Sequence, residues 1–146
     1  MVPQIFDMSA HEARLDRLIS QSFSASFMSN SKWRRLFLAL TAPELGVHQL
    51  VWKFVGRDLP IRGAAPDAEC LGETIIRDTS FAPFPYKEIE WIEIPRANIR
   101  PGDESVPFKH RPQDPEAAQR ILDALGQFEM TLLPEGLRVY GYQHGA

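Results

Sequence analysis

This sequence of 146 residues lacks the features of a disulfide-rich, membrane-spanning or secreted protein. Its single cysteine, Cys70, excludes an intramolecular disulfide and fits a reducing compartment. No apolar run approaches the roughly 20 residues that a transmembrane helix needs. The N-terminal segment also lacks the continuous apolar region of a signal peptide, because Asp7, Glu12 and Asp16 interrupt it. We therefore expect a cytoplasmic protein without a membrane partner.

A strong excess of charge of either sign is missing too. The formal net charge of −3 gives no general attraction to nucleic acid, so a nucleic-acid partner is disfavoured. The chain is 44% hydrophobic and 24% charged, which is typical of a globular protein with a packed core. Its length fits one domain.

Motifs for catalysis or metal binding are not found either. His11, His48, His110 and His144 form no H-x-x-x-H or H-x-H pair, and there is no D-x-D-x-D-G calcium loop. The P-loop, the dinucleotide fingerprint and the G-x-S-x-G elbow are missing as well. The neighbours of Cys70 are acidic, whereas a reactive thiolate needs an electropositive setting, so a nucleophilic cysteine is disfavoured. We predict no catalytic residue, metal ligand or cofactor.

What the chain does contain is three helix patterns. Ser9 to about Gln21 begins with the S-x-x-E form of a capping box. Ser31–Leu40 has apolar residues at i, i+3, i+4 and i+7. A third helix begins at Asp114-Pro115 and ends at Gly126. Between the first two, "SFSASFMSNS" reads as a linker, so we expect residues 1–28 to be an N-terminal extension and residues 29–146 a single α+β domain.

Five segments have the composition of strands. They are Val47–Val55, Glu73–Arg77, Lys87–Ile94, Met130–Leu133 and Leu137–Tyr142. The last two flank "PEG", which predicts a hairpin with Gly136 in the left-handed conformation of a bulged loop. The order α-α-β-β-β-α-β-β lacks regular β-α-β alternation. It predicts an α+β fold, with a mainly antiparallel sheet of about five strands and helices packed on one face.

The segment "PYKEIEWIEIP" is the most acidic candidate for a site. Strand alternation places Glu88 and Glu90 on one face, roughly 7 Å apart, and Glu93 on the other unless a bulge intervenes. The pair could bind a metal or act in acid–base chemistry. The alternative, which we favour, is a solvated strand face whose charges pair across strands with cations such as Lys53, Arg77 or Arg138.

The segment "LRVYGYQ" is the second candidate. Alternation places Arg138, Tyr140 and Tyr142 on one face of a strand. Arginine and tyrosine are enriched at the hot spots of protein interfaces. The alternative is a sheet face whose tyrosines lie beneath a helix with their hydroxyls at the rim.

Three short segments together resemble a known family. They are "NSKW" at Asn30–Trp33, "YKEIEWIEI" at Tyr86–Ile94 and "GLRVYGY" at Gly136–Tyr142. The combination resembles a family of small bacterial proteins of unknown function whose members open with N-x-K-W. The resemblance covers residues 29–142, and this chain departs from it by proline-rich insertions at 56–84 and 95–112. It implies no activity and no cofactor.

These observations predict a non-catalytic cytosolic protein that binds another protein, in the manner of an immunity protein or antitoxin. The predicted binding residues are Glu88, Glu90, Arg138, Tyr140 and Tyr142. Self-association is left open.

Two other functions stay open at this point. One is a small metal-dependent hydrolase, in which His48 or His110 joins Glu88 and Glu90. The other is a sensor that holds a small molecule between sheet and helices, beside Trp52 and Trp91.

Overall fold

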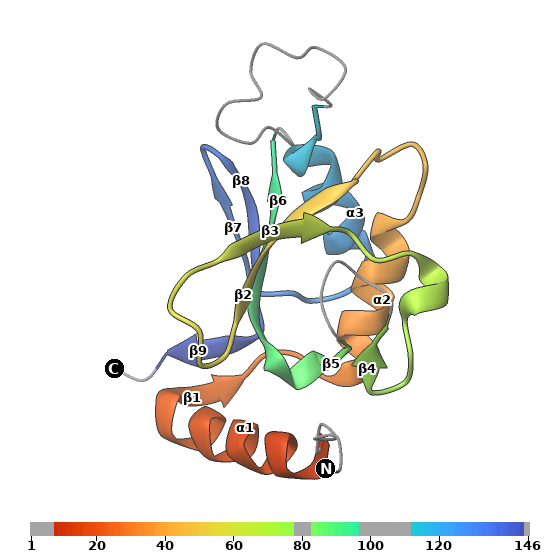
Figure 1. The fold of residues 1–146 in the computed structure, drawn as a ribbon. Coiled ribbons are helices and arrows are strands. Elements are labelled where there is room, and N and C mark those ends of the chain that lie inside the picture. Colours follow the sequence, from red (N-terminus) through yellow and green to blue (C-terminus); the bar gives the residue numbers. More distant parts are fainter. Residues whose placement is uncertain (1–7, 78–82, 97–111, 145–146) are drawn as a thin grey trace.

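The protein has an α+β fold, as predicted (Figure 1). The computed structural model describes residues 8–77, 83–96 and 112–144. His110 and most of the second proline-rich insertion therefore lie outside the described residues. The helical elements are α1 (Met8–Ser22), α2 (Asn30–Leu40), α3 (Pro115–Leu125) and the 3₁₀ turns η1 (Ala68–Cys70) and η2 (Tyr86–Glu88). No helix within these ranges is long and apolar enough to cross a membrane.

An antiparallel sheet of five strands in the order β3-β2-β6-β8-β7 forms the centre of the fold. Its strands are β2 (Gln49–Phe54), β3 (Ile61–Ala64), β6 (Ile89–Pro95), β7 (Met130–Leu133) and β8 (Gly136–Tyr140). Two small antiparallel sheets pair β1 (Phe23–Ser26) with β9 (Tyr142–His144) and β4 (Ile75–Ile76) with β5 (Phe84–Pro85). Helices α2 and α3 lie on the same side of the five-stranded sheet (Figure 1).

The starts of α2 and α3 are fixed by local capping. The Ser29 side chain accepts a hydrogen bond of 3.1 Å from the Lys32 amide. The Asp114 carboxylate accepts one of 3.0 Å from the Ala117 amide, and Pro115 occupies the first turn. Each cap satisfies an amide that has no partner within its helix. The predicted third helix is confirmed at both ends.

One predicted strand pairs outside the five-stranded sheet and one strand of that sheet is not among the predictions, although the number of strands agrees. The segment around Glu73–Arg77 is not in the five-stranded sheet, because only Ile75–Ile76 is extended and it pairs with β5. The sheet is completed instead by β3, in a segment where no strand was predicted. Strand β3 has only four residues, one of them Gly63, so it carries too little alternation to be recognised from sequence.

The turn between β7 and β8 also differs from the prediction. It holds Pro134 and Glu135, and Gly136 is the first residue of β8. Gly136 does not have a positive φ. It is needed for a different reason: an ideal Cβ there would lie 2.4 Å from the Ile94 carbonyl oxygen.

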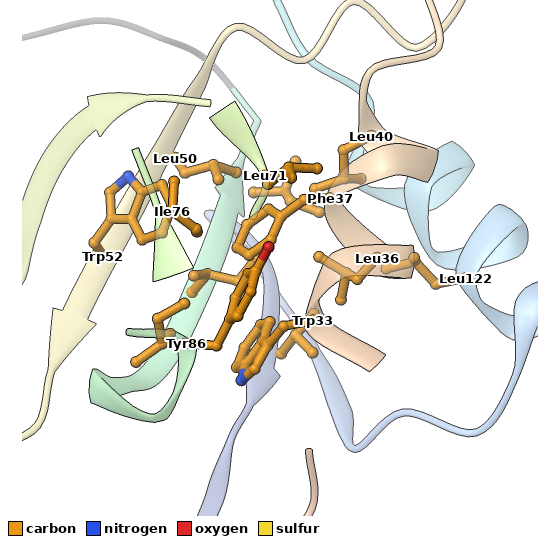
Figure 2. Packing of buried hydrophobic residues seen from close by; sticks show 14 of the residues in the cluster. Trp33, Leu36, Phe37, Leu40, Leu50, Trp52, Leu71, Ile76, Tyr86 and Leu122 are labelled. Atoms are coloured by element: carbon orange, nitrogen blue, oxygen red, sulfur yellow. The ribbon is translucent and has the colours of Figure 1, made fainter. Parts of the chain in front are cut away.

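Aromatic side chains fill the core between the sheet and the two helices (Figure 2). The Phe37 ring lies at its centre, with ring centroids 5.6 Å from Trp33, 5.5 Å from Trp52 and 6.5 Å from Tyr86. The Tyr86 hydroxyl donates to the Gly72 carbonyl at 2.9 Å, so its polar end is satisfied. Burying a side chain of this size contributes about 1.5–3 kcal/mol to stability.

Helix α1, β1 and β9 form a separate unit at one end of the sheet (Figure 1). The predicted linker is wrong over Phe23–Ser26, which pairs with β9. Leu15, Val55 and Tyr142 form a second small core, and the Phe23 ring stacks on Tyr142 at 4.7 Å between centroids. It stays a prediction that residues 29–146 form a domain to which residues 1–28 are an extension.

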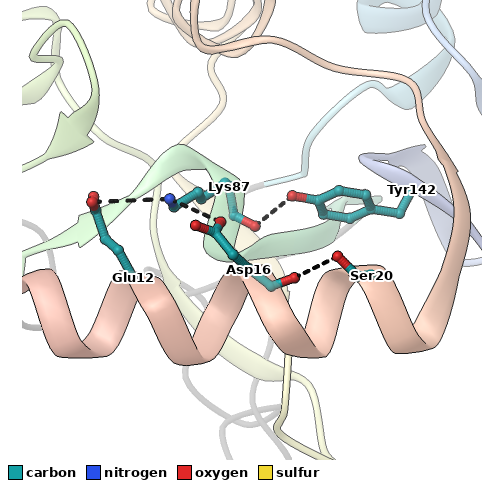
Figure 3. Close-up of polar contacts among 5 residues, drawn as sticks. All are labelled: Glu12, Asp16, Ser20, Lys87 and Tyr142. Atoms are coloured by element: carbon teal, nitrogen blue, oxygen red, sulfur yellow. Dashed lines mark hydrogen bonds and ion pairs between the residues drawn. The ribbon is translucent and has the colours of Figure 1, made fainter.

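Polar contacts join α1 to η2 at this end of the sheet (Figure 3). The Lys87 ammonium lies 3.1 Å from Asp16 and 3.9 Å from Glu12, both on α1. The Tyr142 hydroxyl donates a hydrogen bond of 2.7 Å to the Lys87 carbonyl. Burial, followed by the nearby Asp16 carboxylate, raises the pKa of Tyr142 to about 12.

This pKa predicts a loss of stability in alkali that depends on Tyr142. Because it exceeds the value of about 10 for an unfolded tyrosine, the contribution is complete below pH 10 and is lost as the pH rises toward 12. Denaturant unfolding of the wild type and of Tyr142→Phe, at pH 8 and pH 12, measures it. The wild type's advantage in free energy of unfolding is expected to shrink by about 1–2 kcal/mol, less than the full linkage value because the Tyr142 hydroxyl is only partly buried. An advantage that does not change with pH would contradict this assignment.

Candidate functional site

The five-stranded sheet has an inner face toward α2 and α3 and an outer face on the opposite side. Along β2, Leu50, Trp52 and Phe54 are buried in the core, so Val51 and Lys53 point outward. The described helices α2 and α3 both cover the inner face (Figure 1). We define the outer face by the side chains Val51, Lys53, Arg62, Trp91, Glu93, Arg138 and Tyr140.

A bulge in β6 decides which of its residues reach this face. Phe54 pairs with Ile89 and Lys53 with Trp91, so Glu90 is an extra residue on β6. After the bulge, Ile92 and Ile94 point into the core together with Ile89. Ile89 therefore does not share a face with Trp91 and Glu93 as strict alternation would place it, because alternation does not hold across a bulge.

The predicted pair of Glu88 and Glu90 on one strand face is also wrong. Glu88 is not in the strand but ends η2, and its carboxylate lies 3.2 Å from the His11 ring of α1. The Glu90 carboxylate lies 3.1 Å from the Lys53 ammonium. The two glutamates thus take different partners, and that of Glu88 comes from the predicted extension.

Within the described residues, Glu88, Glu90 and His48 do not come together as the hydrolase alternative requires, and His110 lies outside those residues. His48 precedes β2 and lies five residues from Lys53, a span of about 17 Å along an extended chain. Within the described ranges, no group of three histidine, cysteine, aspartate or glutamate side chains could hold a metal ion.

The centre of the outer face is a contact among Arg138, Trp91 and Glu93. The Arg138 guanidinium donates from Nε and Nη2 to one Glu93 carboxylate oxygen, at 3.3 and 3.1 Å. It also lies over the Trp91 ring, 3.8 Å from the centroid, in a cation–π contact. Glu93 is only 6% exposed, so its charge requires this partner. Arg138 is thereby held in one orientation while staying partly exposed.

The cross-strand neighbours of Trp91 lie on both sides of this contact. Trp91 pairs with Lys53 on β2 and with Tyr140 on β8. Tyr140 is partly exposed. Arg138 and Tyr140 share one face of β8, as predicted, and Leu137 and Val139 on its other face are buried in the core.

Tyr142 does not join Arg138 and Tyr140. Strand β8 ends at Tyr140, and Tyr142 belongs to β9, where its ring packs in the small core beside α1. The predicted ligand wall of the sensor is not formed either, because Trp52 is buried in the inner core whereas Trp91 lies on the outer face.

A cleft of about 250 Å³ lies at the end of the outer face near α1. Lys53 and Glu90 line it together with apolar side chains of α1, β1 and the chain after β2, including Leu18, Phe23 and Val55. The cleft therefore combines the Lys53–Glu90 ion pair with apolar side chains and with the charged residues Arg57 and Asp58. Of the predicted binding residues, Glu90 lines this cleft, and Arg138 and Tyr140 lie on the outer face. Glu88 contacts His11 of α1, and Tyr142 belongs to β9, in the unit that α1, β1 and β9 form.

Comparison of the chain with protein-family models, with curated proteins and with solved structures gives no match. The resemblance to a small bacterial family stays a prediction.

Proposed function

We propose that this protein is a non-catalytic cytoplasmic module that binds a partner protein through the outer face of its sheet. The observation that carries the proposal is the contact of Arg138 with Trp91 and Glu93, on the face opposite α2 and α3. Its arginine, tryptophan and tyrosine side chains are the types that dominate binding energy in interfaces. Because Arg138 is already fixed by Glu93, docking would cost little side-chain entropy.

The exposure of the charges indicates the chemistry of the partner. Glu90 and Glu93 are 7% and 6% exposed, and each is paired with a cation. The side chains that a partner can reach include Arg62, which is exposed, and Arg138. The outer face thus favours a partner surface that offers carboxylates or carbonyl oxygens. An apolar side chain at the centre of that partner surface would fit into the cleft beside Lys53.

An immunity- or antitoxin-like role stays a prediction. Such a role would need an acidic surface to cover a basic toxin site, and Glu90 does not supply one, because it is buried and paired with Lys53. The proposal is therefore a protein-binding role with a partner of acidic or neutral character. A cytoplasmic location is consistent with the lone buried Cys70, which is not in a disulfide.

Charge reversal at matched arginines tests this proposal. Arg62→Glu changes an exposed side chain on the outer face, and Arg120→Glu changes an exposed arginine on α3. The partner is first captured from the native host on the tagged wild type, and its affinity for each purified variant is then measured by calorimetry. We expect Arg62→Glu to weaken binding at least ~10-fold, as for a charge reversal in an interface, and Arg120→Glu to leave it unchanged.

A steric variant tests the same surface without changing its charge. Thr131 is exposed on β7 and pairs with Arg138, so Thr131→Trp places bulk beside the proposed docking surface. We expect this variant to fold and to lose binding. A partner that binds Arg62→Glu and Thr131→Trp as tightly as the wild type would rule out the outer face.

A further inference from the structure

A second cleft, of about 480 Å³, lies on the helix side of the molecule between α2 and the chain entering β4. Its α2 wall is formed by Ser31, Arg34, Arg35 and Leu38, which follow the i, i+3, i+4, i+7 spacing of one helical stripe. This stripe is distinct from the buried residues Trp33, Leu36, Phe37 and Leu40, which form the core side of the same helix. The remaining lining residues are Asn30, Glu73 and Thr74.

Arginines dominate the charge of this cleft. Arg34 and Arg35 are both exposed, and neither forms an ion pair with another described residue. Burial raises the pKa of the Tyr86 hydroxyl, and the nearby positive charges of Arg34 and Arg77 oppose this rise. The one acid in the lining is Glu73. Positive charge therefore gathers at this place in a chain whose net charge is −3.

The lining is also rich in neutral hydrogen-bond donors. Ser31 and Thr74 contribute hydroxyls and Asn30 an amide, next to the two guanidinium groups. The planar guanidinium group of arginine matches the geometry of phosphate oxygens and binds them more strongly than neutral donors do. Thr74 is held in place because its carbonyl accepts a hydrogen bond of 3.1 Å from the Tyr86 amide, so part of the wall opposite α2 is fixed to the core.

We propose that this cleft binds a small phosphate monoester, with the phosphate on Arg34 and Arg35 and the organic part against Leu38. The volume of about 480 Å³ exceeds the space that a free phosphate occupies and lies within the range of about 300–1,000 Å³ common for small-molecule sites. Leu38 is 39% exposed and offers an apolar surface for the organic part. The site is independent of the outer face, which lies on the other side of the sheet.

Calorimetric titration of the full chain with ribose 5-phosphate, and separately with inorganic phosphate, tests this site. We expect ribose 5-phosphate to bind with a Kd on the order of 1 mM or tighter, and inorganic phosphate to bind more weakly. Arg34→Gln and Arg35→Gln are each expected to weaken binding at least ~10-fold, because each loses a charge-assisted contact. Arg120→Gln on α3 is the matched control and is expected to bind as the wild type does.

Circular dichroism of each variant checks that loss of binding does not reflect unfolding; both arginines are exposed, so folding is expected to be retained. The proposal would be overturned if ribose 5-phosphate does not bind at 1:1 stoichiometry. It would also be overturned by equal affinities for the ester and inorganic phosphate, or by binding that survives both substitutions. Tighter binding of a phosphoserine peptide than of ribose 5-phosphate would also overturn it, because the cleft would then serve a protein ligand.

Discussion

Replacing Gln113 by alanine is expected to lower the free energy of unfolding by about 3–5 kcal/mol. Gln113 is 4% exposed, and its side chain makes four hydrogen bonds to backbone. Its carbonyl accepts from the His48 and Gln49 amides at 2.7 and 2.9 Å. Its amide donates to the Gln49 and Pro95 carbonyls at 3.1 and 2.8 Å. Removing it leaves backbone groups of β2 and β6 without these partners.

The position of Gln113 explains why the cost is large. Pro95 has no amide hydrogen, so the backbone ladder between β2 and β6 cannot continue at this end. The Gln113 side chain joins Gln49 to Pro95 there, which makes it part of the sheet.

Urea unfolding of Gln113→Ala measures the loss, with the exposed Gln127→Ala as the matched control. Gln113→Glu separates the two roles of the side chain, because a carboxylate still accepts two hydrogen bonds but cannot donate any. We expect it to be destabilised as well. A loss below about 1 kcal/mol in Gln113→Ala, the value of one ordinary hydrogen bond, would show that the four bonds do not act together.

The second large effect is expected at Gly136. An alanine Cβ there would lie 2.4 Å from the Ile94 carbonyl oxygen and 2.9 Å from the Pro95 Cα, both on the neighbouring β6. Since both atoms belong to the backbone, no side-chain rotation relieves the contact. We expect Gly136→Ala to lower the free energy of unfolding by about 3 kcal/mol, the upper end for overpacking.

Gly126→Ala is the matched control, because the nearest atom to its added Cβ is on the Phe128 side chain at an ordinary 3.8 Å. Thermal or urea unfolding of both variants gives the comparison. Equal stabilities of the two would mean that β6 and β8 are not as close at Gly136 as described.

The positions of α2 and α3 were predictable because their signals are local. The spacing of Trp33, Leu36, Phe37 and Leu40 places α2 in the core, and Asp114 with Pro115 fixes the start of α3. In both cases neighbouring residues decide the structure, so a single sequence carries the information.

The features that shape the outer face depend instead on contacts distant in sequence. The bulge at Glu90 is held by the Val55 amide, which donates to the Glu88 carbonyl, and by the Gly141 amide, which donates to the Glu90 carbonyl. No residue type within "EIEWIEI" specifies these two bonds. Sequence reasoning foresaw that Glu93 could join Glu90 only through a bulge, but could not predict that one occurs.

The predicted binding residues do not form one site, because their positions also depend on contacts distant in sequence. Cross-strand charge pairing, predicted for the face of Glu88 and Glu90, occurs between Glu90 and Lys53, although Glu90 is buried and not solvated. The pairing of Glu93 with Arg138 is not among the predictions. The partner of Glu88, His11, lies in a segment expected to be an extension. Gln113 carried no signal, because a single polar residue before a helix has no periodicity to reveal its burial.

Photo-crosslinking tests the proposed interface most directly. A p-benzoylphenylalanine placed at position 140 lies on the outer face, and the same group at position 120 lies on α3. After irradiation in the native host, we expect position 140 to give a covalent adduct with one partner protein and position 120 to give none. Adducts at position 120 without any at position 140 would contradict a docking surface on the outer face.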